Sequence, residues 1–324
     1  MADSQPVVVP PARATVFLVV TVAPGQEETV RGLLRDVSGL HRSVAFRAPD
    51  DRLSCVVGVG STVWDRLFGG PRPRELHPFV ELRGDRHRAI ATPGDLLFHV
   101  RARRMDLCFE LARLITDRLR GAVTVVDEVH AFKYFDERDL LGFVDGSENP
   151  EGRIGDDAVF VGDEDPDFAG GSYVIVQKYL HDLTAWDALS AEEQEKAVGR
   201  SKLANVELPD DVKPADSHVA LTTITDENGE ERRIVRENMP FGNVGEGEFG
   251  TYFIGYARTP AVTEQMLRNM FLGDGRATHD RILDFSTAVT GCLFHVPTAD
   301  FLDDPPAAPG ATAKAEDILP ARPV

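Results

Sequence analysis

The segment Thr15-Val-Phe-Leu-Val-Val-Thr-Val22 is a run of β-branched and apolar residues, and Pro24-Gly25 follows it directly. Beyond that turn, the i, i+3, i+4, i+7 spacing of one helix face is marked by Val30, Leu33, Leu34 and Val37. The run therefore predicts a strand, a Pro-Gly turn and then an amphipathic helix.

The remainder of the first half continues this alternation. Further strands are predicted at residues 53–59, 95–101 and 122–129, a short helix at 61–68, and a long helix around residues 107–115. The resulting order, βαββαβ, is the ferredoxin-like signature, in which helices cover one face of an antiparallel sheet.

The second half repeats the pattern without a matching sequence repeat. Strands are predicted at 172–179, 232–236, 250–256 and 289–296, and helices at 183–198, with a capping box at Ser190, and at 260–272. We therefore expect an α+β protein with two ferredoxin-like βαββαβ domains. The expected divisions are a flexible N-terminus (1–12), an N-terminal domain (13–135), a C-terminal domain (136–302) and a disordered tail (303–324).

Composition excludes several classes of function. The 324 residues include 35 Lys and Arg against 53 Asp and Glu, a net charge of −18, which repels nucleic acid. The longest apolar run, residues 15–22, is shorter than the roughly 20 residues that span a bilayer. Three dispersed cysteines provide neither a disulfide framework nor a metal cage. Because the N-terminus also lacks a signal peptide, we expect a cytoplasmic protein with no membrane partner.

The loop Gly142-Phe-Val-Asp-Gly146 is the first candidate for chemistry. Glycines on both sides of Asp145 allow a tight turn and a close approach of the backbone to a flat ligand. An ordinary Asx turn would use the same residue types, so the loop alone leaves both interpretations open.

Two more candidates follow further along the chain. His218 comes after Asp216-Ser217, either of which could cap a short helix and place the imidazole on its first turn. Arg236 and Asn238 stand two residues apart in a predicted strand and so address the same face. Alone, His218 could equally be a surface or core histidine, and Arg236 a paired charge on an edge strand.

Together, the motifs 142–150, Asp216-Ser-His218 and 236–242 resemble the dye-decolourising peroxidase family, specifically its B-type branch. The likeness covers residues 12 to 300 and includes the stretches 250–256 and 280–291. It implies two ferredoxin-like domains, with one haem b per subunit held mainly by the C-terminal domain.

The resemblance also implies roles for individual residues. His218 is expected as the proximal iron ligand, and the distal face is expected to be formed by Asp145, Arg236 and Asn238. Arg200 is expected to face a haem propionate, and Ser147 and Asn149 to contact the haem edge or a propionate. The carboxylate that steadies His218 is expected on the last helix, as Asp280 in preference to Asp284.

The implied activity is reduction of hydrogen peroxide through a ferryl intermediate, with oxidation of dyes, phenols or other one-electron donors. Two alternatives remain at this stage: a haem carrier or iron-release protein, and a ligand-binding protein without a cofactor. A homo-oligomer is expected. Encapsulin loading is not, because the final residues, Asp317-Ile-Leu-Pro-Ala-Arg-Pro-Val324, lack the Leu-Gly-Ile-Gly-Ser-Leu type of motif.

Overall fold

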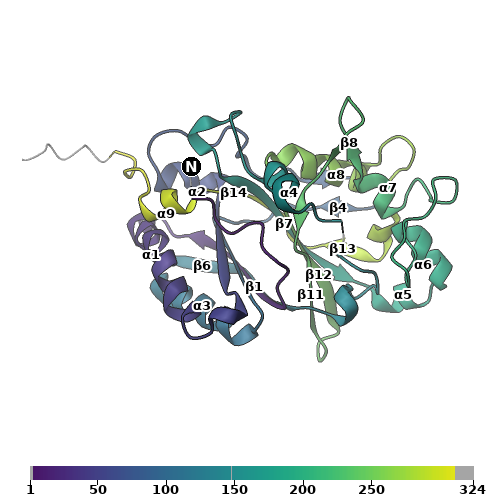
Figure 1. Cartoon of the computed structure of the whole chain (residues 1–324), viewed down its shortest axis with the longest axis horizontal. Coiled ribbons are helices and arrows are strands. Elements are labelled where there is room, and N and C mark those ends of the chain that lie inside the picture. The colour runs from purple at the N-terminus through teal and green to yellow at the C-terminus, as the bar shows by residue number, and fades with distance from the viewer. Residues whose placement is uncertain (1–2, 147, 311–324) are drawn as a thin grey trace, which may run out of the picture.

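Helices cover the outside of a large antiparallel sheet in the computed structural model, which describes residues 3–146 and 148–310. Figure 1 shows α1 and α3 at one end of the molecule and α5 to α8 at the other, with the strands between them. The described part contains no helix long and apolar enough to span a membrane. All three cysteines are buried and free.

The N-terminal half has the expected order of elements. They are β1 (Ala14–Val22), α1 (Glu27–Ala45), β2 (Ser54–Gly60), α2 (Ser61–Leu67), β5 (Leu96–Ala102), α3 (Met105–Arg118) and β6 (Val123–Phe132). The strands pair in the order β2-β5-β1-β6, which is the ferredoxin-like arrangement, and a small hairpin of β3 (Leu82–Arg83) and β4 (Arg88–Ala89) is inserted.

The C-terminal half repeats that arrangement with more interruptions. Its principal elements are β7 (Ser172–His181), α5 (Leu183–Asp187), α6 (Ala191–Val198), α7 (His218–Thr222), β10 (Val235–Arg236), β11 (Met239–Asn243), β12 (Glu248–Ala257), α8 (Pro260–Leu272), β13 (Ser286–Ala288) and β14 (Cys292–Val296). The strand order β14-β7-β12-β10 confirms the second ferredoxin-like unit.

Local details differ from the expectations. The helix predicted at 183–198 is two helices, because Ser190 begins the second with a capping box. The strand predicted at 232–236 is divided between β9 (Glu231–Arg232), which pairs with β8 (Ile224–Thr225), and β10. A turn at residues 244–247 joins β11 to β12, and the two strands pair. Pro240 lies in β11. That edge strand bonds to a neighbour on one side only, so it tolerates a residue without an N–H.

Described residues near both ends of the chain make specific hydrogen bonds. Gln5 is buried, and its amide donates to the carbonyl oxygens of Val57 (2.9 Å) and Pro297 (2.7 Å). In the predicted tail, Ala307 accepts a hydrogen bond from Gly69 N (2.8 Å). Gln5 and Ala307 therefore have hydrogen-bond partners, and the expectations of a flexible N-terminus at 1–12 and a disordered tail at 303–324 stay predictions. Helix α4 (Gly152–Val159) also lies in a stretch that showed no periodicity.

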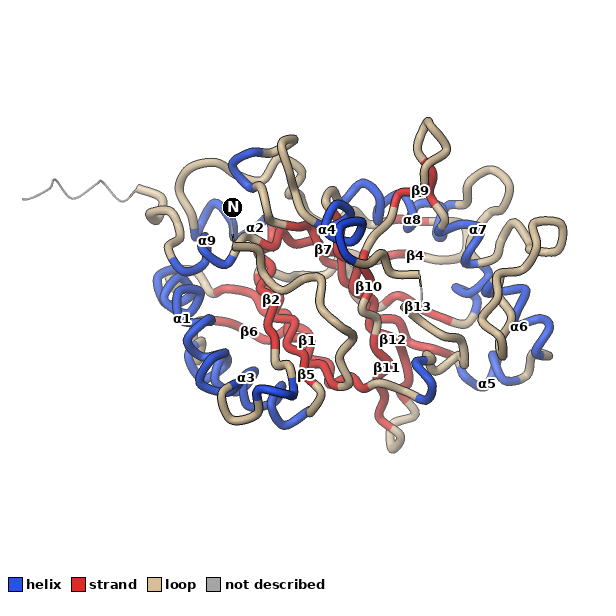
Figure 2. The backbone as a smooth tube through the Cα atoms, viewed as in Figure 1, coloured by secondary structure: helices blue, strands red, loops and turns tan. Residues whose placement is uncertain are grey.

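The two units share one sheet, because β14 pairs with β2. The full order is β10-β12-β7-β14-β2-β5-β1-β6, and the pairs Phe294↔Gly60 and His295↔Val59 form the junction (Figure 2). A second hydrophobic core lies between the two halves, where Phe17 of β1 stacks on Tyr252 of β12 with ring centroids 4.1 Å apart. Because this core contains buried residues from both halves, it fixes the position of one half against the other.

We predict that Gly58→Ala destabilises the protein by about 1–3 kcal/mol, the usual cost of overpacking a core. A Cβ at Gly58 would lie 2.8 Å from Phe294 Cβ, which belongs to β14 and has little room to move. Urea denaturation measures the change. Gly32→Ala is the control, because a Cβ there meets nothing within 4 Å and helix α1 gains a better helix former. Equal effects of the two substitutions would contradict the prediction.

Candidate functional site

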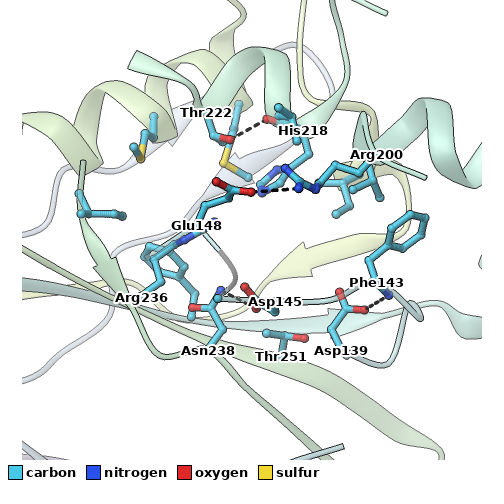
Figure 3. Close-up of a pocket in the computed structure, with 18 of the residues that line it drawn as sticks. Asp139, Phe143, Asp145, Glu148, Arg200, His218, Thr222, Arg236, Asn238 and Thr251 are labelled. Carbon is cyan, nitrogen blue, oxygen red and sulfur yellow. Dashed lines mark hydrogen bonds and ion pairs between the residues drawn. The ribbon is translucent and has the colours of Figure 1, made fainter. Parts of the chain in front are cut away.

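A cavity of about 350 Å³ opens within the C-terminal half, and all the residues that line it fall between Asp139 and Ser286. This volume suits a small-molecule or cofactor site. In Figure 3, His218 lies at the top of the cavity, and Asp145 and Asn238 lie below it. One wall, from β12 and α8, is apolar and includes Phe253, Met266, Leu267 and Met270.

The imidazole of His218 is hydrogen-bonded to a buried carboxylate. His218 is the first residue of α7, whose N-cap Ser217 accepts a hydrogen bond from Ala220 N. Its Nδ1 lies 2.7 Å from Asp280 Oδ2, and Asp280 is fully buried. Because an ionised carboxylate only accepts, Nδ1 is the donor of this hydrogen bond, and a neutral ring then has its lone pair on Nε2. No described residue forms a hydrogen bond with Nε2.

The geometry distinguishes the two candidate carboxylates. Asp280 is not inside a helix: it is the N-cap of the 3-10 turn Arg281–Asp284, where its Oδ1 accepts from Ile282 N at 3.0 Å. Asp284, at the other end of that turn, instead lies 3.0 Å from His87 Nε2. The expectation of a last helix is therefore corrected to a capping position, and Asp280 is the residue that contacts His218.

Across the cavity, Asp145 is fixed by its loop and by Asn238. Asn238 Nδ2 donates to Asp145 Oδ2 at 2.9 Å, and its Oδ1 accepts from Ile254 N at 3.2 Å. Gly142 and Gly146 have φ values of +90° and +82°, which side chains strongly disfavour. The loop therefore needs both glycines to present the carboxylate.

Arg236 lines the same cavity, and two hydrogen bonds join its backbone to the side chain of Asn149. We call this pair of hydrogen bonds the Asn149 clamp. Asn149 Oδ1 accepts from Arg236 N at 2.9 Å, and its Nδ2 donates to Arg236 O. The Asn149 side chain is thus engaged in this clamp and is not among the cavity-lining residues, and its expected contact with haem stays a prediction. Ser147 lies outside the described residues. The described residues provide no hydrogen bond or ion pair to the Arg236 guanidinium.

Arg200 also lines the cavity, but it already has partners. Its Nη2 lies 2.9 Å from Glu148 Oε1 (Figure 3). Its Nε donates to Asn205 Oδ1 at 3.0 Å. Glu148 is itself a lining residue that the sequence did not single out. A ligand carboxylate at Arg200 would therefore share or replace the contact with Glu148.

Two further titratable residues line the cavity without having been predicted. Burial raises the pKa of the Asp139 carboxyl to about 7, although Asp139 Oδ1 accepts a hydrogen bond from Phe143 N. Burial lowers the pKa of His181 to about 4, and its two ring nitrogens contact the hydroxyls of Ser286 and Thr251. His181 ends β7 and Asp139 precedes the glycine loop, positions that carry no distinctive sequence signal.

The donors present fit a metal held in a macrocycle better than a bare ion. Within the described residues, the one group of three or more His, Cys, Asp or Glu side chains close enough to hold an ion is His87, His279 and Asp284, outside this cavity. Around the cavity, His218 has a free ring nitrogen facing a partly apolar space. A single imidazole is the usual protein ligand of haem iron, whose other ligands come from the porphyrin.

Comparison with known proteins gives a consistent result over the whole chain. Family profiles described as Dyp-type peroxidase, N-terminal, and Dyp-type peroxidase, C-terminal, match residues 4–133 and 136–301. A dye-decolorizing peroxidase of Rhodococcus erythropolis is 64% identical over 308 residues, which are 95% of this chain and 90% of the relative.

Solved structures agree. The encapsulated DyP-type peroxidase from Mycobacterium smegmatis has a TM-score of 0.94 at 61% identity, covering 95% of this chain and 100% of that chain. A variant of Rhodococcus jostii RHA1 DypB in complex with heme has a TM-score of 0.91 at 56% identity, covering 93% of this chain and 98% of that chain.

We predict that Asp139→Asn removes a pH dependence of stability. Because the folded carboxyl keeps its proton up to about pH 7, whereas the unfolded one loses it near pH 4, the free energy of unfolding falls as pH rises between these values. The upper limit is about 4 kcal/mol, which contact with water reduces. Urea titrations of the ligand-free protein from pH 4 to 8 test this. Asp136→Asn, at a neighbouring exposed position, is the control and should keep the slope.

Proposed function

This chain belongs to the dye-decolourising peroxidase family, and from that premise we propose how its residues carry out the peroxidase reaction. Within the family, the chain is similar to DypB, a member of the B-type branch. We propose that His218 Nε2 holds the iron of one haem b per subunit, as haem is bound in the Rhodococcus jostii relative. The observation that carries this proposal is the His218–Asp280 hydrogen bond, which leaves Nε2 free toward the cavity.

When bound, haem supplies the iron that coordinates peroxide and the electrons that reduce it. The residues opposite His218 then have complementary tasks. The Asp145 carboxylate accepts a proton from one peroxide oxygen and returns it to the other, directly or through a water. Arg236 stays protonated, so it stabilises the negative charge that develops on the departing oxygen. Asn238 positions Asp145 by donating to it.

Arg200 is proposed to bind a haem propionate. A guanidinium suits a carboxylate because it can donate two parallel hydrogen bonds. The contact with Asn205 holds the Nε side of Arg200, so the guanidinium can exchange Glu148 for a propionate without leaving its position. Glu148 is the residue expected to move.

The expectations about domain boundaries, cellular location and oligomeric state remain proposals. The division into domains at 13–135 and 136–302 is supported by the two βαββαβ units, although these share a sheet. A cytoplasmic location is supported by the three free, buried cysteines, which fit a reducing compartment. A homo-oligomer is supported by exposed Val125, Val126 and Phe132 on β6, which ends the sheet, because exposed apolar edges are typical of interfaces.

Whether this protein is loaded into an encapsulin shell does not follow from the peroxidase reaction. The solved relative from Mycobacterium smegmatis is an encapsulated peroxidase. Our expectation that this chain is not loaded rests on residues 317–324, which lie outside the described residues, and it stays a prediction.

The first test concerns haem retention. We expect His218→Ala to abolish stoichiometric binding of haem with the absorption spectrum of the wild type, because no other described imidazole with a free nitrogen lines the cavity. Asp280→Asn should weaken retention about 10- to 100-fold, the usual effect of losing a ligand's supporting carboxylate. Haem titration monitored by absorbance measures both. Asp274→Asn, which changes a carboxylate paired with Arg276, is the control. Wild-type spectra in both site variants would overturn the assignment.

The second test ranks the two charged residues opposite His218. Arg236→Leu should slow oxidation by peroxide about 100- to 1000-fold, because it removes a charge-stabilising donor. Asp145→Ala should cost less, since water can relay protons. Stopped-flow absorbance with excess peroxide measures these rates. Arg153→Leu, at a side chain 92% exposed on α4, is the control. Equal losses, or a larger loss in Asp145→Ala, would contradict this ranking.

A further inference from the structure

A second group of metal-binding side chains lies outside the cavity, between the two halves of the chain. His87 Nε2 lies 3.0 Å from Asp284 Oδ1, and His279 Nε2 lies 3.4 Å from the same oxygen. We propose that His87, His279 and Asp284 form a site for a divalent cation of the zinc class. The proposal concerns only this group and is independent of how the cavity binds its cofactor.

The positions of the three donor atoms are close to those of a tetrahedral site. In such a site, bonds of about 2.0–2.1 Å place the ligand atoms about 3.3 Å apart. Two of the separations here, 3.0 and 3.4 Å, already match, and all three atoms lie within 4.8 Å of one another. The third separation, between the two imidazoles, is at most 4.8 Å, so the rings would have to approach each other to complete three corners, with water as the fourth ligand.

The surroundings of the imidazoles favour coordination through Nε2. His279 Nδ1 is 3.1 Å from Thr278 Oγ1, and a ring held through one nitrogen presents the other to a metal. The side chains of His87, His279 and Asp284 are 19%, 15% and 27% exposed, so an ion can enter while the ring faces remain packed. The His87 and His279 rings lie 4.9 Å apart.

One positively charged side chain lies beside the group and would have to leave when a cation binds. Asp284 faces the two imidazoles and Arg86, whose Nη2 is 3.5 Å from Asp284 Oδ1. The Arg86 side chain is 63% exposed and can move into solvent, so it would not block an ion. Two imidazoles and one carboxylate suit zinc and similar transition metals, whereas magnesium and manganese prefer sites made of oxygen atoms.

The backbone holds the site in place and joins the two halves through it. His87 lies in the turn between β3 and β4, where Gly84 N donates to His87 O at 3.0 Å. A Cβ at Gly84 would fall only 2.0 Å from Phe271 O, so this turn packs directly on the end of α8. His279 and Asp284 flank Asp280 and Ile282. A bound ion would therefore fix the segment that carries the partner of His218.

Zinc binding to the haem-loaded protein tests the proposal. Equilibrium dialysis against buffered Zn²⁺, followed by metal analysis, should show one zinc per chain in addition to haem iron. In both His87→Ala and Asp284→Asn, the affinity should fall at least about tenfold. The matched control is His130→Ala, which removes an imidazole paired with one carboxylate, Glu128 at 2.7 Å, and should keep the zinc. Visible absorbance of the haem confirms that each variant is folded.

Thermal denaturation gives an independent readout. Zinc should raise the melting temperature of the wild type and of His130→Ala, and leave His87→Ala and Asp284→Asn unchanged, because a ligand stabilises only the state that binds it. Equal binding of Mg²⁺ and Zn²⁺ would overturn the proposal. So would the absence of stoichiometric zinc, or zinc that both site variants retain with wild-type affinity.

Discussion

The hydrogen bond between His218 and the Asp280 carboxylate is the constraint on which the site depends. A fully buried carboxylate is costly unless it has hydrogen-bond donors, and Asp280 receives two, from His218 Nδ1 and Ile282 N. The backbone around it is also tied down, because Asp280 N donates to Met270 O and Arg281 N donates to Asp216 O. The end of α8, the start of α7 and the imidazole are thus fixed by one short segment.

The opposite side of the cavity is organised by amides. Asn238 joins the Asp145 carboxylate to the backbone of Ile254, and Asn149 clamps both polar groups of the Arg236 backbone. Each amide donates one hydrogen bond and accepts another through two separate atoms, whereas an ionised carboxylate in the same place could only accept. The two charged groups that we propose act on peroxide are therefore held by neutral ones, and the Arg236 guanidinium keeps no partner among the described residues.

Much of the fold could be predicted because the spacing of apolar residues and the positions of proline and glycine are local signals. The proline at the start of α8 and the β-branched run of β1 are examples. The junction of β14 with β2 could not, since pairing between strands far apart in sequence has no local signature. In the site, His218, Asp145, Arg236 and Asn238 were recognisable from motifs in combination. The clamp by Asn149, the Glu148 contact of Arg200 and the cavity position of Asp139 depend on tertiary contacts and became visible only in the structure.

The continuous sheet has a consequence for how such chains can evolve. Only two residue pairs link β14 to β2, yet all seven residues of β2 are buried. A gene that encoded either half alone would expose an unpaired strand edge, which is a template for aggregation. A chimera with half of a relative would need matched partners for Gly58 and Phe294 at the junction. A substitution on one side of this boundary therefore requires a matching one on the other, and the halves are poor candidates for independent shuffling.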